Sequence, residues 1–189
     1  MVGRANARRL GLKRLFFCFL AFSFFGGDFA KATSNNTLDT VVNFNLQKYV
    51  GVWYQIAHIP NRFQAMCVSD TKARYEITSS ERIKVVNSCR DEESNLHQAV
   101  GVARLNAKYG NPARLEVRFA PSWTSFLPFV WGDYWVLDID EGYYSVLVGS
   151  PDRRYLWLLA REPTLSETRK IDLVRKASAM GFDVTKLSQ

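Results

Sequence analysis

The sequence predicts an all-β protein, an eight-stranded antiparallel up-and-down barrel with a C-terminal helix packed outside it. Three observations support this fold class. Between residues 51 and 161, short runs of β-branched and aromatic residues are separated by polar turns or by turns that contain Pro or Gly, a pattern typical of antiparallel sheets. Two of these runs alternate strictly between apolar and polar residues. The runs number eight, which is enough to close a barrel around one small ligand.

The first 32 residues resemble an export signal and not a part of the barrel. Basic residues crowd the start, and an uncharged run of 11 residues follows at positions 15–25. This run is too short to span a membrane as a helix, but its length is ordinary for a signal peptide. Ala30 and Ala32 form a small-x-small cleavage site, so we expect residues 1–32 to be a signal peptide, cleaved near Ala32, and residues 33–189 to be the mature domain. The alternatives are a buried core helix and a membrane anchor.

Two features of this leader leave the export route and the anchoring open. Arg8 and Arg9 begin a stretch that resembles a twin-arginine export motif, although Gly11 stands where an aromatic residue is usual, so Sec and twin-arginine export both remain. Cys18 suggests a lipoprotein, but the residue before a lipidated cysteine is small, and here it is Phe17. We therefore expect an exported, soluble protein in the periplasm or cell envelope of a bacterium, with outer-membrane association as the alternative.

The strongly basic character of the chain belongs to this leader. The whole chain has a net charge of +7, but residues 1–32 hold six of its 25 basic residues and one of its 18 acidic residues. The remaining 157 residues therefore have a net charge of +2, and they are enough for one domain with a core. Without the leader, the charge gives no argument for a nucleic-acid partner.

Each of the eight predicted strands is a short β-branched or aromatic run bounded by a turn. In the second strand, Ala73 and Tyr75 alternate with charged residues, and Leu115, Val117 and Phe119 do so in the fifth. One face of each strand is thus apolar, and this face should point into the barrel. The strands span residues 52–59, 71–78, 83–90, 98–105, 114–120, 133–139, 144–149 and 155–161.

The fourth strand predicts an open lumen and not a solid core. Three small residues stand in a row on one of its faces, and they would leave a void that close packing disfavours. A barrel filled by its own side chains is the alternative. The predicted ligand-contacting wall comprises Ala57, Ala73, Tyr75, Ala99, Gly101, Ala103, Leu115, Val117, Phe119 and Tyr134.

A helix follows the eighth strand. Pro163 ends the sheet, Ser166 is a suitable N-cap, and Glu167 is favourable in the first turn. Gly181 stands where a C′ glycine would end the helix. The apolar stripe that should pack on the outside of the barrel comprises Ile171, Val174, Ala177 and Met180, with Leu173 at its margin.

Cys67 and Cys89 remain after the expected cleavage. An exported protein folds in an oxidising compartment, so we expect a disulfide between them. It would close a loop of about 20 residues and contribute on the order of 3 kcal/mol. The alternatives are a reactive or metal-binding thiol pair, which lacks a nearby histidine, and a catalytic nucleophile at Cys67.

The chain contains no sequence motif that indicates catalysis. Its two histidines, His58 and His97, stand in no metal or nucleophile spacing, and the GxSxG, HExxH, CxxC and phosphate-loop motifs are absent. We therefore expect a protein that is not an enzyme, with no catalytic residue, no metal and no cofactor.

The string FNLQKYVGVWYQIA at residues 44–57 resembles the first conserved block of the lipocalin family. The resemblance continues through GDYWVLD at 132–138 and YSVLVG at 144–149, and it ends with YLWLLAR at 155–161. It is closest to the bacterial outer-membrane lipocalins and their apolipoprotein-D-like and plant temperature-induced relatives. The resemblance implies an eight-stranded barrel, a short helical turn before the first strand and a mouth to which the loop at 120–131 belongs.

The resemblance also implies residue roles and a ligand class. In the family, the arginine that ends the last strand packs across the tryptophan of the first strand and closes the barrel floor, which implies a cation–π clamp of Gly51, Trp53 and Arg161. It implies binding, transport or storage of a small hydrophobic ligand, a fatty acid or lysophospholipid. Bacterial relatives suggest a homodimer, which no residue here supports, and they usually carry a lipidated cysteine after the leader.

The loop at residues 120–131, APSWTSFLPFVW, is unusually aromatic. It contains Trp123, Phe126, Phe129 and Trp131, and its two prolines limit its flexibility. Apolar density on a loop marks a ligand lid, a partner site or a membrane contact. Two functional classes follow, a lipid carrier with this loop as its lid and a membrane- or protein-docking module. In a further alternative, the aromatic side chains fold back into the core.

Overall fold

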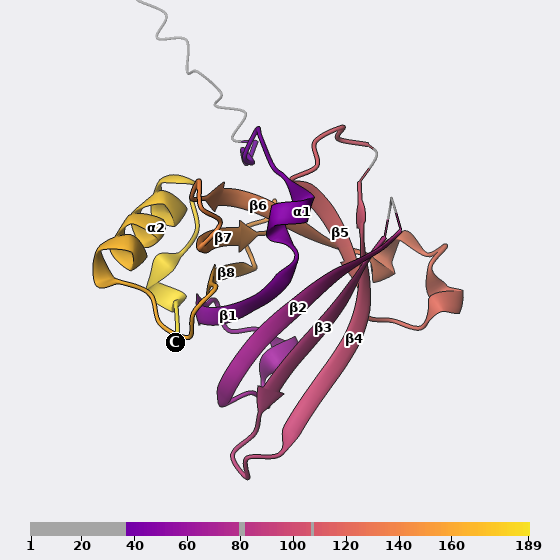
Figure 1. Ribbon diagram of the computed structural model, residues 1–189, viewed down its shortest axis with the longest axis horizontal. Helices are drawn as coiled ribbons and strands as arrows, with labels where there is room; N and C mark the ends of the chain where they lie inside the picture. Colours follow the sequence, from indigo (N-terminus) through magenta and orange to yellow (C-terminus); the bar gives the residue numbers. More distant parts are fainter. Residues whose placement is uncertain (1–36, 80–81, 107) are drawn as a thin grey trace, which may run out of the picture. The chain divides into compact units, whose positions relative to one another are not determined.

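The computed structural model describes residues 37–79, 82–106 and 108–189, so the predicted signal peptide lies outside the described residues. In the described part of the chain, eight antiparallel strands pair in chain order, and the last pairs with the first to close a barrel. This confirms the predicted fold class. The strands are β1 (Gly51–His58), β2 (Ser69–Ser79), β3 (Arg82–Arg90), β4 (Leu96–Leu105), β5 (Arg114–Arg118), β6 (Gly132–Ile139), β7 (Ser145–Gly149) and β8 (Leu156–Ala160) (Figure 1).

The two ends of the barrel differ. Because the strands run in up-and-down order, the connections β1–β2, β3–β4, β5–β6 and β7–β8 share one end, which is named the mouth here. The short helix α1 precedes β1 at the opposite end, the floor. Figure 1 shows β2, β3 and β4 as long strands side by side. The helices and 3-10 turns are α1 (Leu46–Tyr49), η1 (Arg62–Gln64), η2 (Ser122–Thr124), η3 (Pro128–Val130), α2 (Glu167–Ala179) and η4 (Val184–Lys186).

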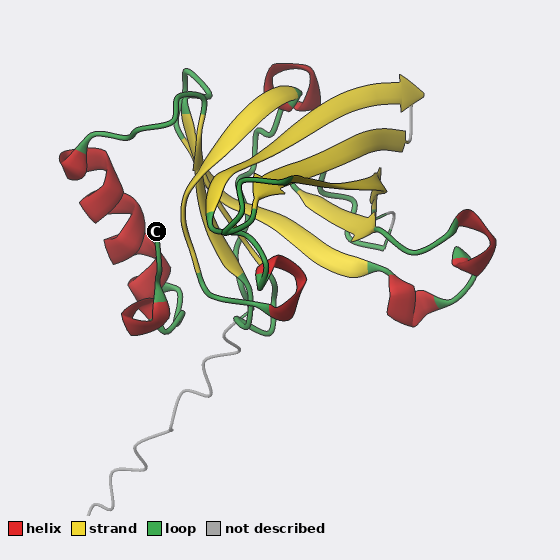
Figure 2. Ribbon diagram, turned by 90° about the horizontal axis from the view of Figure 1, so that it is seen from below, coloured by secondary structure: helices red, strands yellow, loops and turns green. Residues whose placement is uncertain are grey.

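Apolar side chains form two clusters, an inner cluster within the barrel and an outer cluster between the barrel wall and α2. Figure 2 shows the long helix α2 running along one side of the strands. Alternation along a strand decides which cluster a residue joins. On β7, for example, Val146 and Val148 belong to the inner cluster, and Leu147 between them belongs to the outer cluster.

The helix α2 begins and ends where the sequence predicts. Ser166 accepts a hydrogen bond from the Arg169 N–H, and Gly181 follows the last turn with a φ of 86°, which suits glycine. Asp138 on β6 holds the helix to the barrel. Its Oδ2 accepts a hydrogen bond from Arg169 at 2.9 Å, and its Oδ1 accepts one from Lys176 at 2.6 Å.

The face that α2 presents to the barrel differs from the prediction. Leu173 and Ala177 are fully buried, whereas Ile171 is 64% exposed. The prediction that placed Ile171 in the buried stripe and Leu173 at its margin was therefore wrong. The ion pairs of Asp138 orient the helix so that Leu173 packs among the outward leucines of β8.

Cys67 and Cys89 form a disulfide, which confirms the prediction. It joins the β1–β2 connection to the end of strand β3 at the mouth, and the two cysteines are 22 positions apart in the sequence. Because the bond constrains the unfolded chain, it should contribute roughly 3 kcal/mol to stability.

Candidate ligand-binding site

The floor of the barrel is closed by an arginine stacked on a tryptophan. The Arg161 guanidinium carbon lies 3.8 Å from the centre of the Trp53 ring, and Trp53 is fully buried. This is the arrangement that the sequence resemblance implies. The guanidinium donates hydrogen bonds to the backbone carbonyls of Lys48, Tyr49, Val52 and Tyr143.

Gly51 makes room for this arginine. Its φ is 103°, and a Cβ at this position would lie 3.1 Å from Nη1 of Arg161. A side chain here would be strained by the backbone conformation and would crowd the guanidinium. The glycine two residues before Trp53 therefore allows the floor to close.

Three tyrosine hydroxyls meet inside the barrel next to this floor, and they are named the tyrosine trio. Tyr49 comes from α1, Tyr75 from β2 and Tyr134 from β6. The Oη of Tyr134 lies 2.6 Å from the Oη of Tyr49 and 2.8 Å from the Oη of Tyr75. Burial raises the pKa of all three, to about 12 for Tyr75. The hydroxyls therefore keep their protons at neutral pH.

Predicted wall residues on β2, β4, β5 and β6 face into the barrel. Across β2, β3 and β4, the pairing of the strands places the inward residues in two rows. The row nearer the floor holds Tyr75, Val85 and Gly101. The row nearer the mouth holds Ala73, Asn87 and Ala99. Of the predicted residues, the inner cluster contains Ala73, Tyr75, Ala103, Leu115 and Tyr134, with Val117 packed against it.

Exposure along β4 changes from the mouth to the floor. Ala99 faces inward and is nevertheless exposed to solvent. Ala103, four residues nearer the floor, is only 2% exposed. The inner wall is thus accessible from the mouth and closed below.

Phe119 lies against Gly101 near the mouth. A Cβ at Gly101 would lie 2.7 Å from Cδ1 of Phe119 and 2.7 Å from the carbonyl oxygen of Arg118, so only glycine leaves room for the ring. Phe119 keeps 41% of its surface exposed. A pocket of about 310 Å³ opens beside it, between β4 and the β5–β6 connection.

Ala57 does not join the lumen wall, contrary to the prediction. It belongs to the outer cluster, with Leu158 and Leu173. The reason is a bulge between Gln55 and Ala57, where the pairing of β1 with β8 shifts register. A bulge adds one residue to a strand and so reverses its alternation.

A chain of polar side chains lies at the mouth end of β1 and β8, and no spacing in the sequence indicated it. Trp157 Nε1 donates to Gln64 Oε1 at 2.9 Å, and Gln64 Nε2 donates to Gln55 Oε1 at 2.8 Å. Gln55 Nε2 then lies 3.0 Å from Nδ1 of His58. An indole nitrogen can only donate, so Gln64 turns its Oε1 toward Trp157 and its Nε2 toward Gln55. Gln55 then turns its Nε2 toward Nδ1 of His58, and this ring nitrogen accepts the hydrogen bond. His58 is therefore neutral, and burial lowers its pKa.

The aromatic loop stands away from the core. Trp123, Phe126 and Phe129 are 74, 76 and 80% exposed, so these three side chains do not fold back. Trp131 is half-buried, and its ring lies 3.9 Å from the guanidinium carbon of Arg104. The loop joins an apolar rim of the mouth, which comprises Phe63, Met66, Val68, Leu96, Trp123, Phe126 and Phe129.

Arg118 anchors the base of this loop. Although it belongs to the charged series of the fifth strand, it is only 7% exposed. Its Nη1 donates to the carbonyl oxygens of Ala120 and Pro121. These bonds turn the chain out of the sheet, so β5 ends at Arg118 and not at residue 120.

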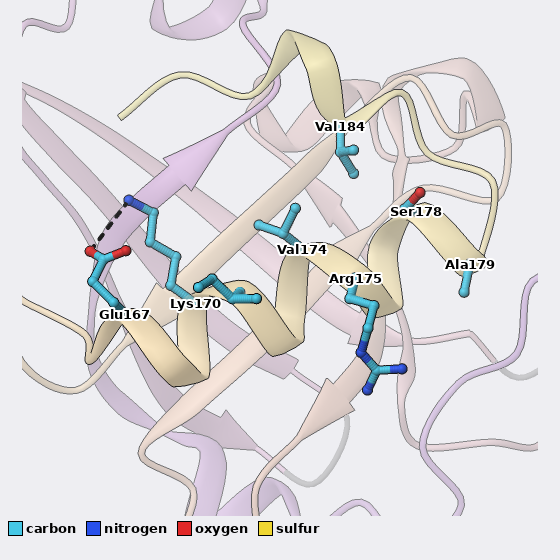
Figure 3. Close-up of a pocket in the computed structure, with 8 residues that line it drawn as sticks. Glu167, Lys170, Val174, Arg175, Ser178, Ala179 and Val184 are labelled. Carbon is cyan, nitrogen blue, oxygen red and sulfur yellow. Dashed lines mark ion pairs between the residues drawn. The ribbon is translucent and has the colours of Figure 1, made fainter.

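A separate groove of about 690 Å³ lies on the exposed side of α2 (Figure 3). Ile171, Val174 and Val184 form its apolar part, and an ion pair between Glu167 and Lys170 borders it. The groove contains none of the predicted site residues.

The described residues include no group of three or more His, Cys, Asp or Glu side chains that could hold a metal ion. In the same part of the chain, no helix has the length and apolarity that are needed to cross a membrane. The side chains described above give the barrel an apolar wall, hydroxyl groups near its floor and amide groups at its mouth.

Comparisons with known proteins agree on one family. Residues 44–189 match the family described as a lipocalin-like domain. The chain is similar to temperature-induced lipocalin-1 of Arabidopsis thaliana, with 35% identity over 82% of this chain and 83% of that protein. It is also similar to the outer membrane lipoprotein Blc of Escherichia coli (strain K12), with 34% identity over 78% of this chain and 79% of that protein. Its fold is similar to that of insecticyanin from the tobacco hornworm Manduca sexta, with a TM-score of 0.61 and 18% identity over 80% of this chain and 82% of that chain.

Proposed function

This chain belongs to the lipocalin family, and we propose that it binds, transports or stores a fatty acid or lysophospholipid in the lumen of its barrel. Lipocalins are generally non-catalytic proteins that bind small hydrophobic ligands, and the comparisons indicate no enzyme family. The acyl chain would lie in the lumen, and the headgroup would lie at the mouth.

The observation that carries this proposal is the exposed Ala99 on the inner face of β4, above a closed floor. Small inward residues on neighbouring strands leave space for a ligand, because a solid core would fill these positions with larger side chains. The stacked Trp53 and Arg161 then limit how deeply a ligand can enter. A concave apolar site with few polar groups is suited to an acyl chain.

The expected affinity follows from the size of the ligand. A chain of about 20 heavy atoms at roughly 0.3 kcal/mol per atom gives about 6 kcal/mol, which corresponds to tens of micromolar. A preformed dry pocket would improve this value to about micromolar.

Two measurements test the proposal. The full chain is expressed, and the product is purified without added lipid and examined by native mass spectrometry for a bound molecule. After delipidation, calorimetry with fatty acids and lysophospholipids should give one-to-one binding. If no acyl ligand binds saturably, the carrier function is wrong.

We place the protein in the bacterial cell envelope. The support is the predicted signal peptide at residues 1–32 and the similarity to an outer membrane lipoprotein. Cell fractionation should recover the protein from the periplasm or the outer membrane. Its intact mass should correspond to residues 33–189, without an added lipid, and a cytoplasmic product of full mass would contradict the proposal.

The exposed aromatic loop favours a second candidate function, a module that docks to a membrane. Residues 119–131 contain no charged side chain, and apolar patches of this kind mark contact surfaces. In flotation with phosphatidylcholine vesicles, wild-type protein should float, and the variant with Ser at Trp123, Phe126 and Phe129 should not. Ile171→Ser, which changes an exposed apolar residue on α2, is the matched control. Self-association that the loop variant abolishes would indicate a homodimer instead.

A further inference from the structure

Arg118 is a buried cation without an anionic partner. It stands opposite Val102 on the outer face of the barrel wall, and yet it is only 7% exposed. Glu116, two positions earlier on the same face, pairs with Arg104 at 2.9 Å instead. Among the described residues, no carboxylate forms an ion pair with Arg118. A buried charge that lacks a counter-ion is unfavourable, so a ligand that supplies one would be bound there.

Only one nitrogen of this guanidinium is used by the protein. Nη1 donates to the carbonyl oxygens of Ala120 and Pro121. Nε is buried and has no hydrogen-bond partner among the described residues. Nη2 also lacks a partner there, but it is accessible to solvent. Nε and Nη2 form the edge of a guanidinium that pairs with two oxygens of one anion. The edge that binds an oxyanion is therefore the one that the protein leaves free.

The pocket of about 310 Å³ at the β5–β6 connection lies next to Arg118. Val100, Val102 and Arg118 line it from outward positions of β4 and β5, so it opens on the outer face of the barrel wall and not into the lumen. Arg118 and Ser122 provide its polar side-chain groups, and its other lining residues are apolar. Its volume is at the lower end of the range for ligand sites. The pocket therefore suits one polar headgroup and not a whole lipid.

We propose that this pocket binds the phosphate group of a phospholipid headgroup, with Nε and Nη2 of Arg118 as the two donors. The inference rests on the second candidate function, docking of the aromatic loop to a membrane. Trp123, Phe126 and Phe129 stand exposed on the loop that Arg118 anchors. When these side chains enter the boundary of the acyl region, the base of their loop lies at the depth of the headgroups. Lipid phosphates lie at this depth.

The charges beside the pocket match this group. The guanidinium carbons of Arg104 and Arg118 lie 3.9 and 5.2 Å from the centre of the Trp131 ring. Glu116 neutralises Arg104, so one positive charge is left at Arg118. A phosphodiester carries one negative charge and offers two free oxygens, which is what the free edge of one guanidinium accepts. Inorganic phosphate has the same oxygens but no acyl chain to contact the apolar loop.

Soluble probes test the pocket directly, on the delipidated product of the full chain. In proton–nitrogen NMR spectra, the Nε–H signal of Arg118 is identified by its loss in Arg118→Gln. Dihexanoylphosphatidylcholine, added as monomers, should shift this signal saturably. Inorganic phosphate is the second probe, and its Kd should be at least about tenfold higher. Equal Kd values would assign the pocket to free phosphate and overturn its assignment to a lipid.

Flotation with phosphatidylcholine vesicles tests the pocket at a membrane. Arg118→Gln keeps a donor for a loop carbonyl but removes the charge, and it should lower the vesicle partition coefficient roughly tenfold. Arg114→Gln is the matched control, since Arg114 lies on the same face of β5 and over an indole ring, that of Trp135 at 4.5 Å, but does not line the pocket. It should float like wild type.

A second variant keeps Arg118 and supplies it with an internal anion. Val102→Glu places a carboxylate directly opposite Arg118, so it should compete with the lipid phosphate and weaken flotation by a similar factor. Ile171→Glu adds the same charge at an exposed position of α2 and should have no such effect. If Arg118→Gln does not fold, as judged by circular dichroism, Val102→Glu decides.

The inference is overturned if neither probe shifts the Arg118 signal, or if folded Arg118→Gln and Val102→Glu float like wild type. Flotation of wild type and of both variants alike would leave membrane docking by the loop standing. Wild-type protein that does not float would overturn the docking function, and the spectra with the soluble probes would then decide whether the pocket binds a phosphate group.

Discussion

Replacing Arg161 tests how the floor of the barrel is held together. Its guanidinium stacks on Trp53 at 3.8 Å and donates to four backbone carbonyls. Each hydrogen bond is worth roughly 0.5–1.5 kcal/mol, and the cation–π contact is worth about 1 kcal/mol. At a half-buried site, water can replace some of the hydrogen bonds that the guanidinium makes. Arg161→Ala should therefore lower the free energy of unfolding by about 2–4 kcal/mol.

Arg104 offers a matched control for this substitution. Its guanidinium lies over Trp131 at 3.9 Å, almost the same distance, but its side chain is exposed and pairs with Glu116. Arg104→Ala should therefore cost less than about 1 kcal/mol. Arg161→Lys keeps the charge but has one donor nitrogen in place of three, so its loss should be intermediate.

Urea unfolding followed by tryptophan fluorescence measures these differences as shifts in the transition midpoint at constant slope. Because Arg161 lies beneath the lumen, the Kd for an acyl ligand should stay within about twofold of the wild-type value. A loss below about 0.5 kcal/mol in Arg161→Ala, or an equal loss in Arg104→Ala, would refute the reasoning about the carbonyl bonds.

Three further outcomes are expected. Gly132→Phe should fill the space beside the tyrosine trio, so calorimetry should show lost acyl binding while the melting temperature stays near that of wild type. Thiol titration of unfolded, unreduced protein should find Cys67 and Cys89 blocked, and replacing both with Ser should cost roughly 3 kcal/mol in urea unfolding. Because burial lowers the pKa of His58, the unfolded state binds more protons near pH 6, and the free energy of unfolding should fall as the pH falls from about 7 to 5. His58→Asn, which keeps an acceptor for Gln55, should reduce this fall, and a fall equal to that of wild type would contradict the assignment.

Local patterns in the sequence predict most of the fold. Alternation places Tyr75 and Leu115 on the inner face, because neighbouring side chains of a strand point to opposite sides. Ser166 and Gly181 mark the ends of α2, because a helix cap depends on only a few adjacent residues. These features were predictable because their causes lie within a few positions along the chain.

The candidate site was predictable where the strands are regular and not where they deviate. The bulge before Ala57 reverses the alternation of β1 and moves that side chain to the outer cluster. The helix α2 has apolar residues over a wide arc, and only the barrel decides that Leu173, and not Ile171, is buried. A bulge and a helix rotation both depend on partners that are distant in sequence.

The sequence by itself determined that the chain forms strands with an apolar inner face, a capped helix and a disulfide. The tertiary structure alone decided that three tyrosine hydroxyls meet. Tyr134 is separated by 85 residues from Tyr49 and by 59 residues from Tyr75. Hydrogen bonds over such separations depend on strand register and barrel closure, and no local pattern specifies which inward side chains come to lie at the same depth.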